Sequence, residues 1–216
     1  MARSFFSVID NLSLQDIESE ADLIPLLTTE DEEALENEAL PEVVPILPLR
    51  NTVLFPGVVI PITAGRDKSI QLIKDANSAD KIIGVVAQKN QSIENPGSKD
   101  VHELGTVAQI LRVLKMPDGN TTIIIQGKKR FKIKNILKEE PYIKASIDSV
   151  ADEIPDINDK EFSATIDSIK DLALQIINEN PNIPSEASFA IKNIQTPSFL
   201  INFVASNMNV KAGAKQ

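Results

Sequence analysis

The chain has 216 residues, a formal net charge of −9 and no cysteine. The lack of cysteine excludes a disulfide framework and Cys-ligated metal sites, while a hydrophobic fraction of 42% can supply a proper core. No stretch approaches the roughly 18 apolar residues that a bilayer-spanning helix needs, and the first residues lack the long apolar run of a signal peptide. We therefore expect a soluble, cytoplasmic protein that does not enter a membrane.

Negative charge is concentrated at the N-terminus. Residues 1–42 hold twelve carboxylates and one base, residues 43–150 hold sixteen bases and ten acids, and residues 151–216 hold five bases and nine acids. We interpret residues 1–42 as an acidic arm, and prefer a disordered tail over an arm that docks on its own domain, because crowded like charges resist compaction. The overall acidity argues against nucleic acid as a partner, since phosphate neutralisation supplies most nonspecific affinity.

Residues 43–150 are predicted to form a β-rich lobe. The apolar segment 43–49 is broken by prolines, which favours an edge strand, and residues 58–63 and 81–89 are further strand candidates. Between them the apolar period becomes helical and predicts one short amphipathic helix. Its apolar face consists of Ile70, Leu72, Ile73 and Ala76.

A β-hairpin is the strongest local signal. Two β-rich runs, 105–115 and 121–126, flank the turn sequence Pro117-Asp118-Gly119-Asn120. The alternation around Phe131 and the segment 142–147 predict two more strands. Many short strands with turn punctuation and one helix favour a small, highly curved sheet or an open barrel.

Residues 151–216 are predicted to form an all-helical lobe after a linker at 151–156. Asn158 is the expected N-cap of the first helix, and a second helix is expected over 184–194. Thr196 is expected to cap a third helix with Pro197 at its first position. The apolar stripe of the first helix comprises Phe162, Ile166, Ile169, Ala173, Ile176 and Ile177. The expected fold class is therefore α+β.

The sequence offers little for catalysis. It contains no glycine-rich phosphate loop, and its single histidine, His102, excludes sites with two His ligands. Adjacent acids such as Glu139-Glu140 are interpreted as solvated, and no Ser-Lys pair is singled out. We expect no catalytic, cofactor-binding or metal-binding residue in this chain, and we interpret it as a binding module.

A basic run in the middle of the chain is the remaining candidate site. It could bind nucleic acid or an acidic partner. The alternation of its residues favours instead the solvated face of an antiparallel strand, with Phe131 on the buried face, and we prefer this interpretation. The run comprises Lys128, Lys129, Arg130, Lys132 and Lys134.

Six segments in order across residues 45–131 resemble the N-terminal domain of Lon proteases. They are LPLRN at 47–51 with VLFP at 53–56, GRDKSI at 65–70, VAQK at 86–89, GTVA at 105–108, KMPDG at 115–119 and GKKRF at 127–131. Residues 183–186 and 203–207 resemble the helices that follow in that domain. The acidic arm, residues 1–42, lies outside the resemblance.

The resemblance implies a PUA-like curved sheet or pseudo-barrel at 43–150, with a helical bundle at 151–216 that stops before the ATPase and protease modules. It implies recognition of unfolded or degron-bearing protein substrates, and support for a homohexamer. The parent would be a cytosolic ATP-dependent serine protease that degrades misfolded and regulatory proteins. ATP and Mg would bind in the parent's downstream module, and this chain would hold no cofactor.

Two surfaces are candidates for substrate contact. The first comprises Phe55, Pro56, Arg66, Asp67 and Lys68. The second is a cleft in which residues 142–147 face the helical stripe, whereas Phe199 and Phe203 are expected in the core. Two other functions stay open: a stand-alone Lon-domain receptor for a small ligand or degron, and, less favoured, an RNA-binding PUA-like protein.

Overall fold

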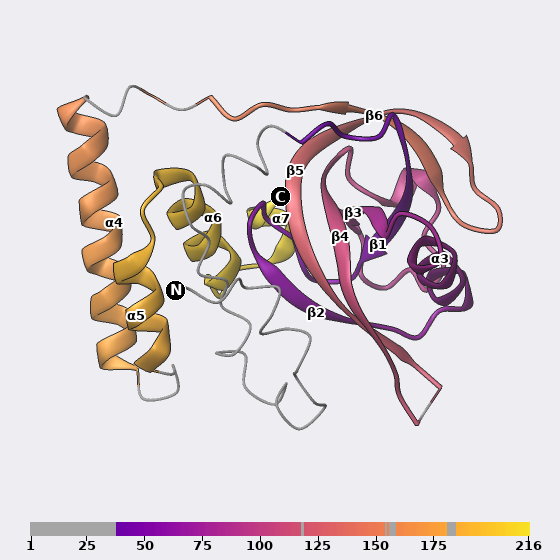
Figure 1. The fold of residues 1–216 in the computed structure, drawn as a ribbon, viewed down its shortest axis with the longest axis horizontal. Helices are drawn as coiled ribbons and strands as arrows, with labels where there is room; N and C mark the ends of the chain where they lie inside the picture. Colours follow the sequence, from indigo (N-terminus) through magenta and orange to yellow (C-terminus); the bar gives the residue numbers. More distant parts are fainter. Residues whose placement is uncertain (1–37, 118, 154, 156–158, 181–184) are drawn as a thin grey trace.

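The computed structural model describes residues 38–117, 119–153, 155, 159–180 and 185–216 (Figure 1). Residues 1–37 of the predicted acidic arm therefore lie outside the described residues. The order along the chain is β1 (Val43–Leu49), β2 (Val59–Ala64), α3 (Asp67–Asn77), β3 (Ile82–Ala87), the 3₁₀ turn η3 (Ser98–Asp100), β4 (Leu104–Lys115), β5 (Thr121–Lys138), β6 (Lys144–Ser149), α4 (Lys160–Glu179), α5 (Ser185–Asn193), α6 (Pro197–Asn207) and α7 (Ala212–Lys215).

The sheet closes on itself. Its order is β2-β5-β4-β3-β1-β6, and β5 also pairs with β6. Strands β5, β4, β3, β1 and β6 therefore form a ring, and β2 adds to the first half of β5. Among the strands that the structure describes, only β1 and β3 pair in parallel, and the other neighbours are antiparallel. The expected curved sheet is thus a closed barrel rather than an open one, and closure leaves fewer free strand edges.

Strand β5 makes this closure possible by its length. It runs for 18 residues, so the two strands predicted on either side of residue 127 are one continuous strand. Its first half pairs with β2 and its second half with β6, while β4 lies along most of its length. The predicted hairpin between β4 and β5 is confirmed, with Gly119 at φ 88° in the turn.

The prediction of an edge strand at 43–49 is wrong. β1 lies between β3 and β6, and its prolines sit within these ladders, with Pro45 opposite Lys144 and Pro48 opposite Val86. Proline removes only its own N–H, and other ladder donors remain: the Ile46 N–H donates to the Ile143 carbonyl at 2.8 Å. The ring therefore tolerates two prolines in an internal strand.

Two apolar clusters fill and cover the barrel. Phe131, fully buried, lies in the cluster formed by β1, β3, β4, β5 and β6, as its register predicted. A Cβ at Gly84 or Gly105 would approach the Phe131 ring to 3.0 or 2.8 Å, so both glycines make room for it. The second cluster lies under α3, whose Leu72 and Ile73 are buried as the amphipathic pattern predicted.

The C-terminal helices pack on the barrel rather than forming a separate lobe. Figure 1 shows α6 between the barrel and the pair α4–α5, with α3 at the opposite end. Phe199 and Phe203 of α6 are buried, as expected, in a cluster that also contains Phe55 and Val58 from the loop before β2. The helices and the barrel thus share one apolar cluster.

Two details of the helical prediction differ from the structure. Asn158 lies outside the described residues, and the N-cap of α4 is Asp159, whose carboxylate accepts from the Glu161 and Phe162 N–H groups. Ile176 belongs to the predicted apolar stripe of α4 but is 60% exposed, and no residue of α4 is fully buried, because the helix packs against α5 and α6 along one side only. The cap of α6 is confirmed: the Thr196 hydroxyl accepts from the Phe199 N–H.

The loop before β2 lies close against Gly127 of β5. A Cβ there would overlap the Phe55 carbonyl oxygen and come within 3.1 Å of the Thr106 methyl group. Only a residue without a side chain lets the loop lie this near to β5.

We predict that Gly127→Ala lowers the free energy of unfolding by about 2–3 kcal/mol, because the backbone must shift to relieve the overlap. Urea unfolding followed by circular dichroism measures this. Gly213→Ala in α7 is the matched control, since a Cβ there meets nothing within 4 Å. Equal stabilities of the two variants would contradict the close approach.

Candidate functional site

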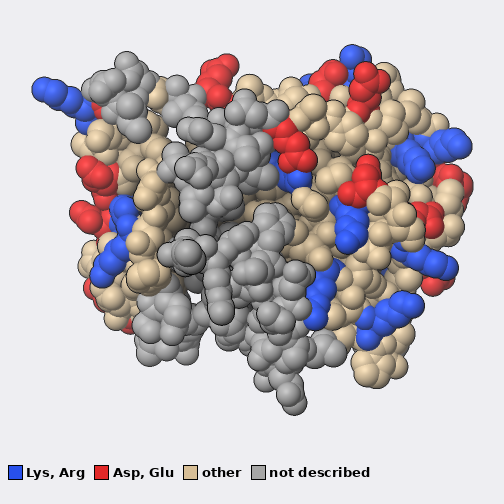
Figure 2. All heavy atoms as spheres, viewed as in Figure 1, with Lys and Arg blue, Asp and Glu red and all other residues tan. Residues whose placement is uncertain are grey.

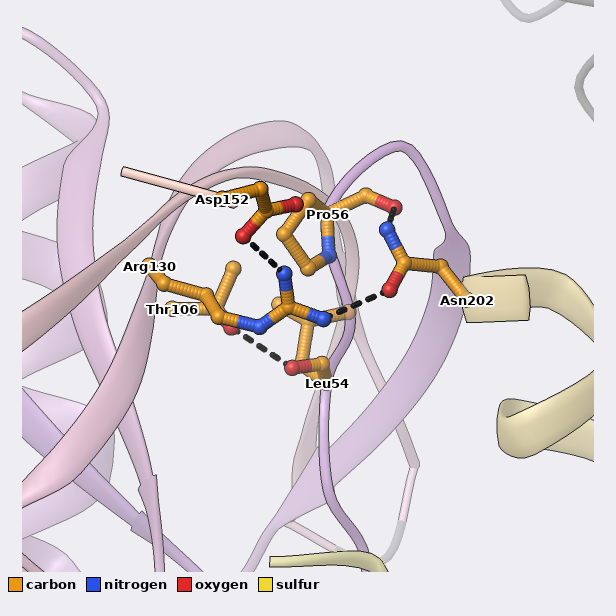
Figure 3. Close-up of polar contacts among 6 residues, drawn as sticks. All are labelled: Leu54, Pro56, Thr106, Arg130, Asp152 and Asn202. Atoms are coloured by element: carbon orange, nitrogen blue, oxygen red, sulfur yellow. Dashed lines mark hydrogen bonds and ion pairs between the residues drawn. The ribbon is translucent and has the colours of Figure 1, made fainter. Parts of the chain in front are cut away.

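Residues 54–58, here called the junction loop, are held on the barrel by backbone hydrogen bonds. The Gly57 N–H donates to the Gly127 carbonyl at 2.8 Å, and the Gly127 N–H donates to the Val58 carbonyl at 2.9 Å. The buried Thr106 hydroxyl donates to the Leu54 carbonyl at 2.6 Å (Figure 3). These bonds fix the junction loop to β4 and β5.

Arg130 and Asn202 join the junction loop to the helices. Figure 3 shows the Arg130 guanidinium between the linker residue Asp152 and Asn202 of α6. It donates to Asp152 Oδ1 at 2.5 Å and to Asn202 Oδ1 at 2.6 Å, and Asn202 Nδ2 donates to the Pro56 carbonyl at 3.3 Å. Asn202 is only 4% exposed, so its amide must be satisfied within the protein. One arginine and one asparagine thus connect β5, the linker, α6 and the junction loop.

Phe55 does not present its ring on the surface, as the substrate-contact prediction requires. It is 8% exposed and packs in the apolar cluster with α5 and α6. The adjoining Pro56 is half-buried, and its carbonyl accepts from Asn202. The junction loop therefore acts as a packing element between barrel and helices, a role that depends on residues about 140 positions later in the sequence.

Arg66, Asp67 and Lys68, here called the charged triplet, lie at the start of α3. Arg66 donates to the Gln88 side-chain oxygen at 2.9 Å. Gln88 is 3% exposed, and its amide nitrogen donates to the Asn90 and Ile93 carbonyls, both at 2.6 Å. Partial burial and then the nearby Arg50 lower the pKa of Arg66, which still stays protonated as arginines do in proteins. The Arg66 guanidinium is therefore held in place by a buried amide.

The rest of the charged triplet is more exposed. Lys68 pairs with Glu140 at 2.6 Å, with side chains 49% and 76% exposed, so the pair contributes at most about 1 kcal/mol. Asp67 is exposed in the first turn of α3, where the helix dipole favours a carboxylate. Next to Glu140, hydrogen bonds from Ser98 lower the pKa of Glu139. The charged triplet remains accessible to a polypeptide.

The structure does not bring the five predicted contact residues together. The charged triplet lies with Gln88 and Glu140 on the α3 side, whereas Phe55 and Pro56 contact α6. Figure 1 places α3 and the helices α4–α6 at opposite ends of the barrel. Sequence reasoning did not single out Gln88, although it lies in the segment VAQK at 86–89, or Asn202, which lies in no such motif.

The basic run faces acidic or polar groups throughout. Lys132 lies 3.6 Å from Glu103, and Lys134 lies 3.3 Å from Asp148, with all four side chains more than half exposed. These two lysines lie on the exposed strand face that alternation predicted. On the visible face, Figure 2 shows basic and acidic side chains interspersed rather than a field of one sign.

Lys128 departs from that pattern. Its side chain is only 8% exposed, and its ammonium pairs with the Glu38 carboxylate at 2.5 Å, while Lys129 donates to the Glu38 carbonyl at 2.9 Å. The prediction of a solvated strand face is therefore wrong at Lys128. The cause is a β-bulge: between the pairs Thr106–Arg130 and Ala108–Gly127, both lysines oppose a single residue of β4.

The second predicted contact surface, residues 142–147 facing the helices, is wrong. The Tyr142 hydroxyl donates to Asp75 of α3 at 2.9 Å, and burial raises the pKa of Tyr142, with the bond to Asp75 adding to the effect. Ile143 and Ile147 lie in the barrel cluster. This segment therefore packs toward α3 and the barrel interior.

Within the part of the chain that the structure describes, no three His, Cys, Asp or Glu side chains gather as they would around a metal ion. His102 is half-buried, and its backbone N–H donates to the Ala87 carbonyl. Among the helices that the structure describes, none is both long enough and apolar enough to cross a bilayer.

We predict that Asn202→Ala lowers the free energy of unfolding by about 1–3 kcal/mol, because Arg130 and the Pro56 carbonyl lose a buried partner. Chemical denaturation measures the change. Asn207→Ala, on the exposed end of the same helix, is the control and should change stability by less than about 0.5 kcal/mol. A neutral effect of Asn202→Ala would show that the junction does not depend on this amide.

The sequence is similar to a known family and to several of its members. The family model described as the ATP-dependent protease La (LON) substrate-binding domain matches residues 43–216. The chain is 68% identical over 208 residues to the Lon protease of Flavobacterium johnsoniae, covering 96% of this chain and 26% of that protein. It is 50% identical over 195 residues to the Lon protease of Cytophaga hutchinsonii, covering 90% of this chain and 24% of that protein. The chain thus spans about a quarter of the length of the curated relatives it matches.

The fold has a solved counterpart. The N-terminal domain of the Mycobacterium avium complex Lon protease superimposes with a TM-score of 0.64 at 20% identity, covering 80% of this chain and 87% of that one. At this identity the likeness concerns the fold alone. Taken with the family match over 43–216, it leads to one conclusion: the chain belongs to the family of ATP-dependent protease La (LON) substrate-binding domains.

Proposed function

We propose that this chain is the substrate-recognition and assembly-supporting region of an ATP-dependent Lon protease that degrades misfolded and regulatory proteins. The observation that carries the proposal is the family match over residues 43–216, which includes both the barrel and the helices. The chain would contribute binding, while ATP, Mg and the peptidase chemistry would belong to other modules of the parent. We extend the proposal to the PUA-like class for the barrel and to a cytoplasmic homohexamer for the parent.

The charged triplet supports this role from the α3 side. Arg66 is fixed by the buried Gln88, and Lys68 and Asp67 are accessible, so the group offers donors and an acceptor on a rigid element. Surface charges of this kind orient a chain and affect the rate of encounter more than the affinity. The expected affinity is therefore modest, at micromolar or weaker Kd.

Apolar contact would come from the helices rather than from Phe55. Leu172 and Ile176 of α4 and Phe189 of α5 are 58%, 60% and 60% exposed. Exposed apolar groups on packed helices suit unfolded polypeptides, which offer apolar side chains without a fixed sequence. Several such weak contacts would combine through avidity in an oligomeric parent.

The other functions have less support. A stand-alone Lon-domain receptor for a ligand or degron would use the same charged triplet and stays the alternative. RNA binding is disfavoured because members of the basic run face Glu38, Glu103, Asp148 and Asp152 instead of solvent alone. A basic group that already pairs with a carboxylate is less available to neutralise a phosphate. It therefore releases fewer of the counterions condensed on a nucleic acid and adds less to the affinity.

We predict that the 216-residue chain binds a labelled, chemically denatured protein with a Kd in the micromolar range or weaker, and that Lys68→Gln weakens binding about threefold or more by removing an orienting charge. Fluorescence anisotropy measures this. Lys74→Gln, with the same charge change on the exposed face of α3, should leave the Kd unchanged. Equal effects of both substitutions, or no binding at all, would refute the assigned role.

A further inference from the structure

Lys128 stands out because its charge is buried. Its side chain is 8% exposed, whereas those of Lys132 and Lys134 on the same strand are each 59% exposed. Its ammonium donates to both carboxylate oxygens of Glu38, at 2.7 and 2.5 Å. Lys129 adds a bond to the Glu38 backbone carbonyl at 2.9 Å. The two lysines of the β-bulge therefore converge on one residue.

This site requires an anion. Removing one member of a buried ion pair leaves a desolvated charge and is strongly unfavourable, whereas an exposed lysine is simply solvated by water. Among the described residues, Glu38 is the carboxylate that meets this requirement. If Glu38 leaves, a replacement anion must occupy its place or the ammonium must become exposed.

Glu38 is placed so that it can leave. It lies outside the strands and helices, and its side chain is 44% exposed. The residues that follow Glu38 are attached to the barrel: Leu40 packs against the barrel cluster, and the Glu42 carbonyl accepts from the Ile147 N–H at 3.0 Å. Release of Glu38 therefore breaks three hydrogen bonds and leaves β1 in its ladder.

We propose that Lys128 and Lys129 form a carboxylate-binding site that Glu38 occupies as an internal ligand, and that an acidic segment of a polypeptide substrate takes its place. The identification of the occupant as a substrate rests on the proposed function. The site is separate from the charged triplet, which involves neither lysine, so the two can be tested independently.

Glu38 belongs to the same chain as Lys128 and Lys129, and this link determines how strongly it competes with an external peptide. A ligand on the same chain is present at a high effective concentration, so an external peptide must first displace it. The apparent Kd for an acidic peptide is then the intrinsic Kd divided by the fraction of molecules with Glu38 released. Neutralising Glu38 should therefore strengthen acidic-peptide binding, the opposite of what loss of a structural ion pair would do.

The test uses a fluorescein-labelled ten-residue glutamate peptide, with a glutamine peptide of equal length as the neutral probe. We expect Glu38→Gln to lower the Kd for the glutamate peptide about fivefold or more and to leave the glutamine peptide unbound. Glu42→Gln is the matched control, because it removes the same charge from the same segment and its exposed side chain has no ion-pair partner among the described residues. Its Kd should equal that of the unchanged chain.

Two further variants guard against unfolding. Lys128→Gln in the Glu38→Gln background should abolish glutamate-peptide binding, and the milder Lys129→Gln should weaken it while thermal unfolding stays cooperative. Identical Kd values for Glu38→Gln, Glu42→Gln and the unchanged chain would overturn the proposal.

Failure of this site can be told apart from failure of the proposed function. Binding of denatured protein without enhancement by Glu38→Gln overturns the site and leaves substrate recognition intact. Enhanced binding of the glutamate peptide without any binding of denatured protein supports the carboxylate site and refutes the substrate as its occupant.

Discussion

The structure depends on the close approach of the junction loop to Gly127. Because residue 127 has no side chain, the loop backbone can exchange two hydrogen bonds with β5 and can lie within reach of Thr106. The same loop turns Phe55 toward α5 and α6, and its Pro56 carbonyl accepts from Asn202. A single segment of backbone thus has the barrel on one side and the helices on the other.

This constraint decides which surfaces are available for binding. Packing of Phe55 removes an aromatic side chain from the surface, and the apolar side chains that stay exposed include Leu172 and Ile176 of α4 and Phe189 of α5. The charged triplet lies at the other end of the barrel, fixed through Gln88, while Lys128 and Lys129 face the segment before β1. Under the proposed function, these separate regions would each make a weak contact, which suits recognition of chains that share no sequence.

Local features were predictable from the sequence, and features that depend on distant pairing were not. The β4–β5 hairpin followed from turn residues, the α3 face from its period, and the α6 cap from Thr196 and Pro197. Closure of the barrel requires β6 to pair with both β1 and β5. No local sequence pattern predicts which distant strands will pair. For the same reason the prolines of β1 predict an edge strand, although β1 lies inside the ring.

The candidate site shows the same division. The exposure of the charged triplet follows from its position at a helix start, whereas the burial of Phe55 depends on α6, and that of Lys128 depends on a bulge in β5.

Because the junction loop contacts both parts, the barrel and the helices should unfold as one cooperative unit. Native-state hydrogen exchange across a urea series tests it most directly. We expect the protected amides of β5 and α6 to exchange with the same free energy and the same urea dependence. Exchange of α6 through a separate opening, well below the free energy of global unfolding, would contradict it.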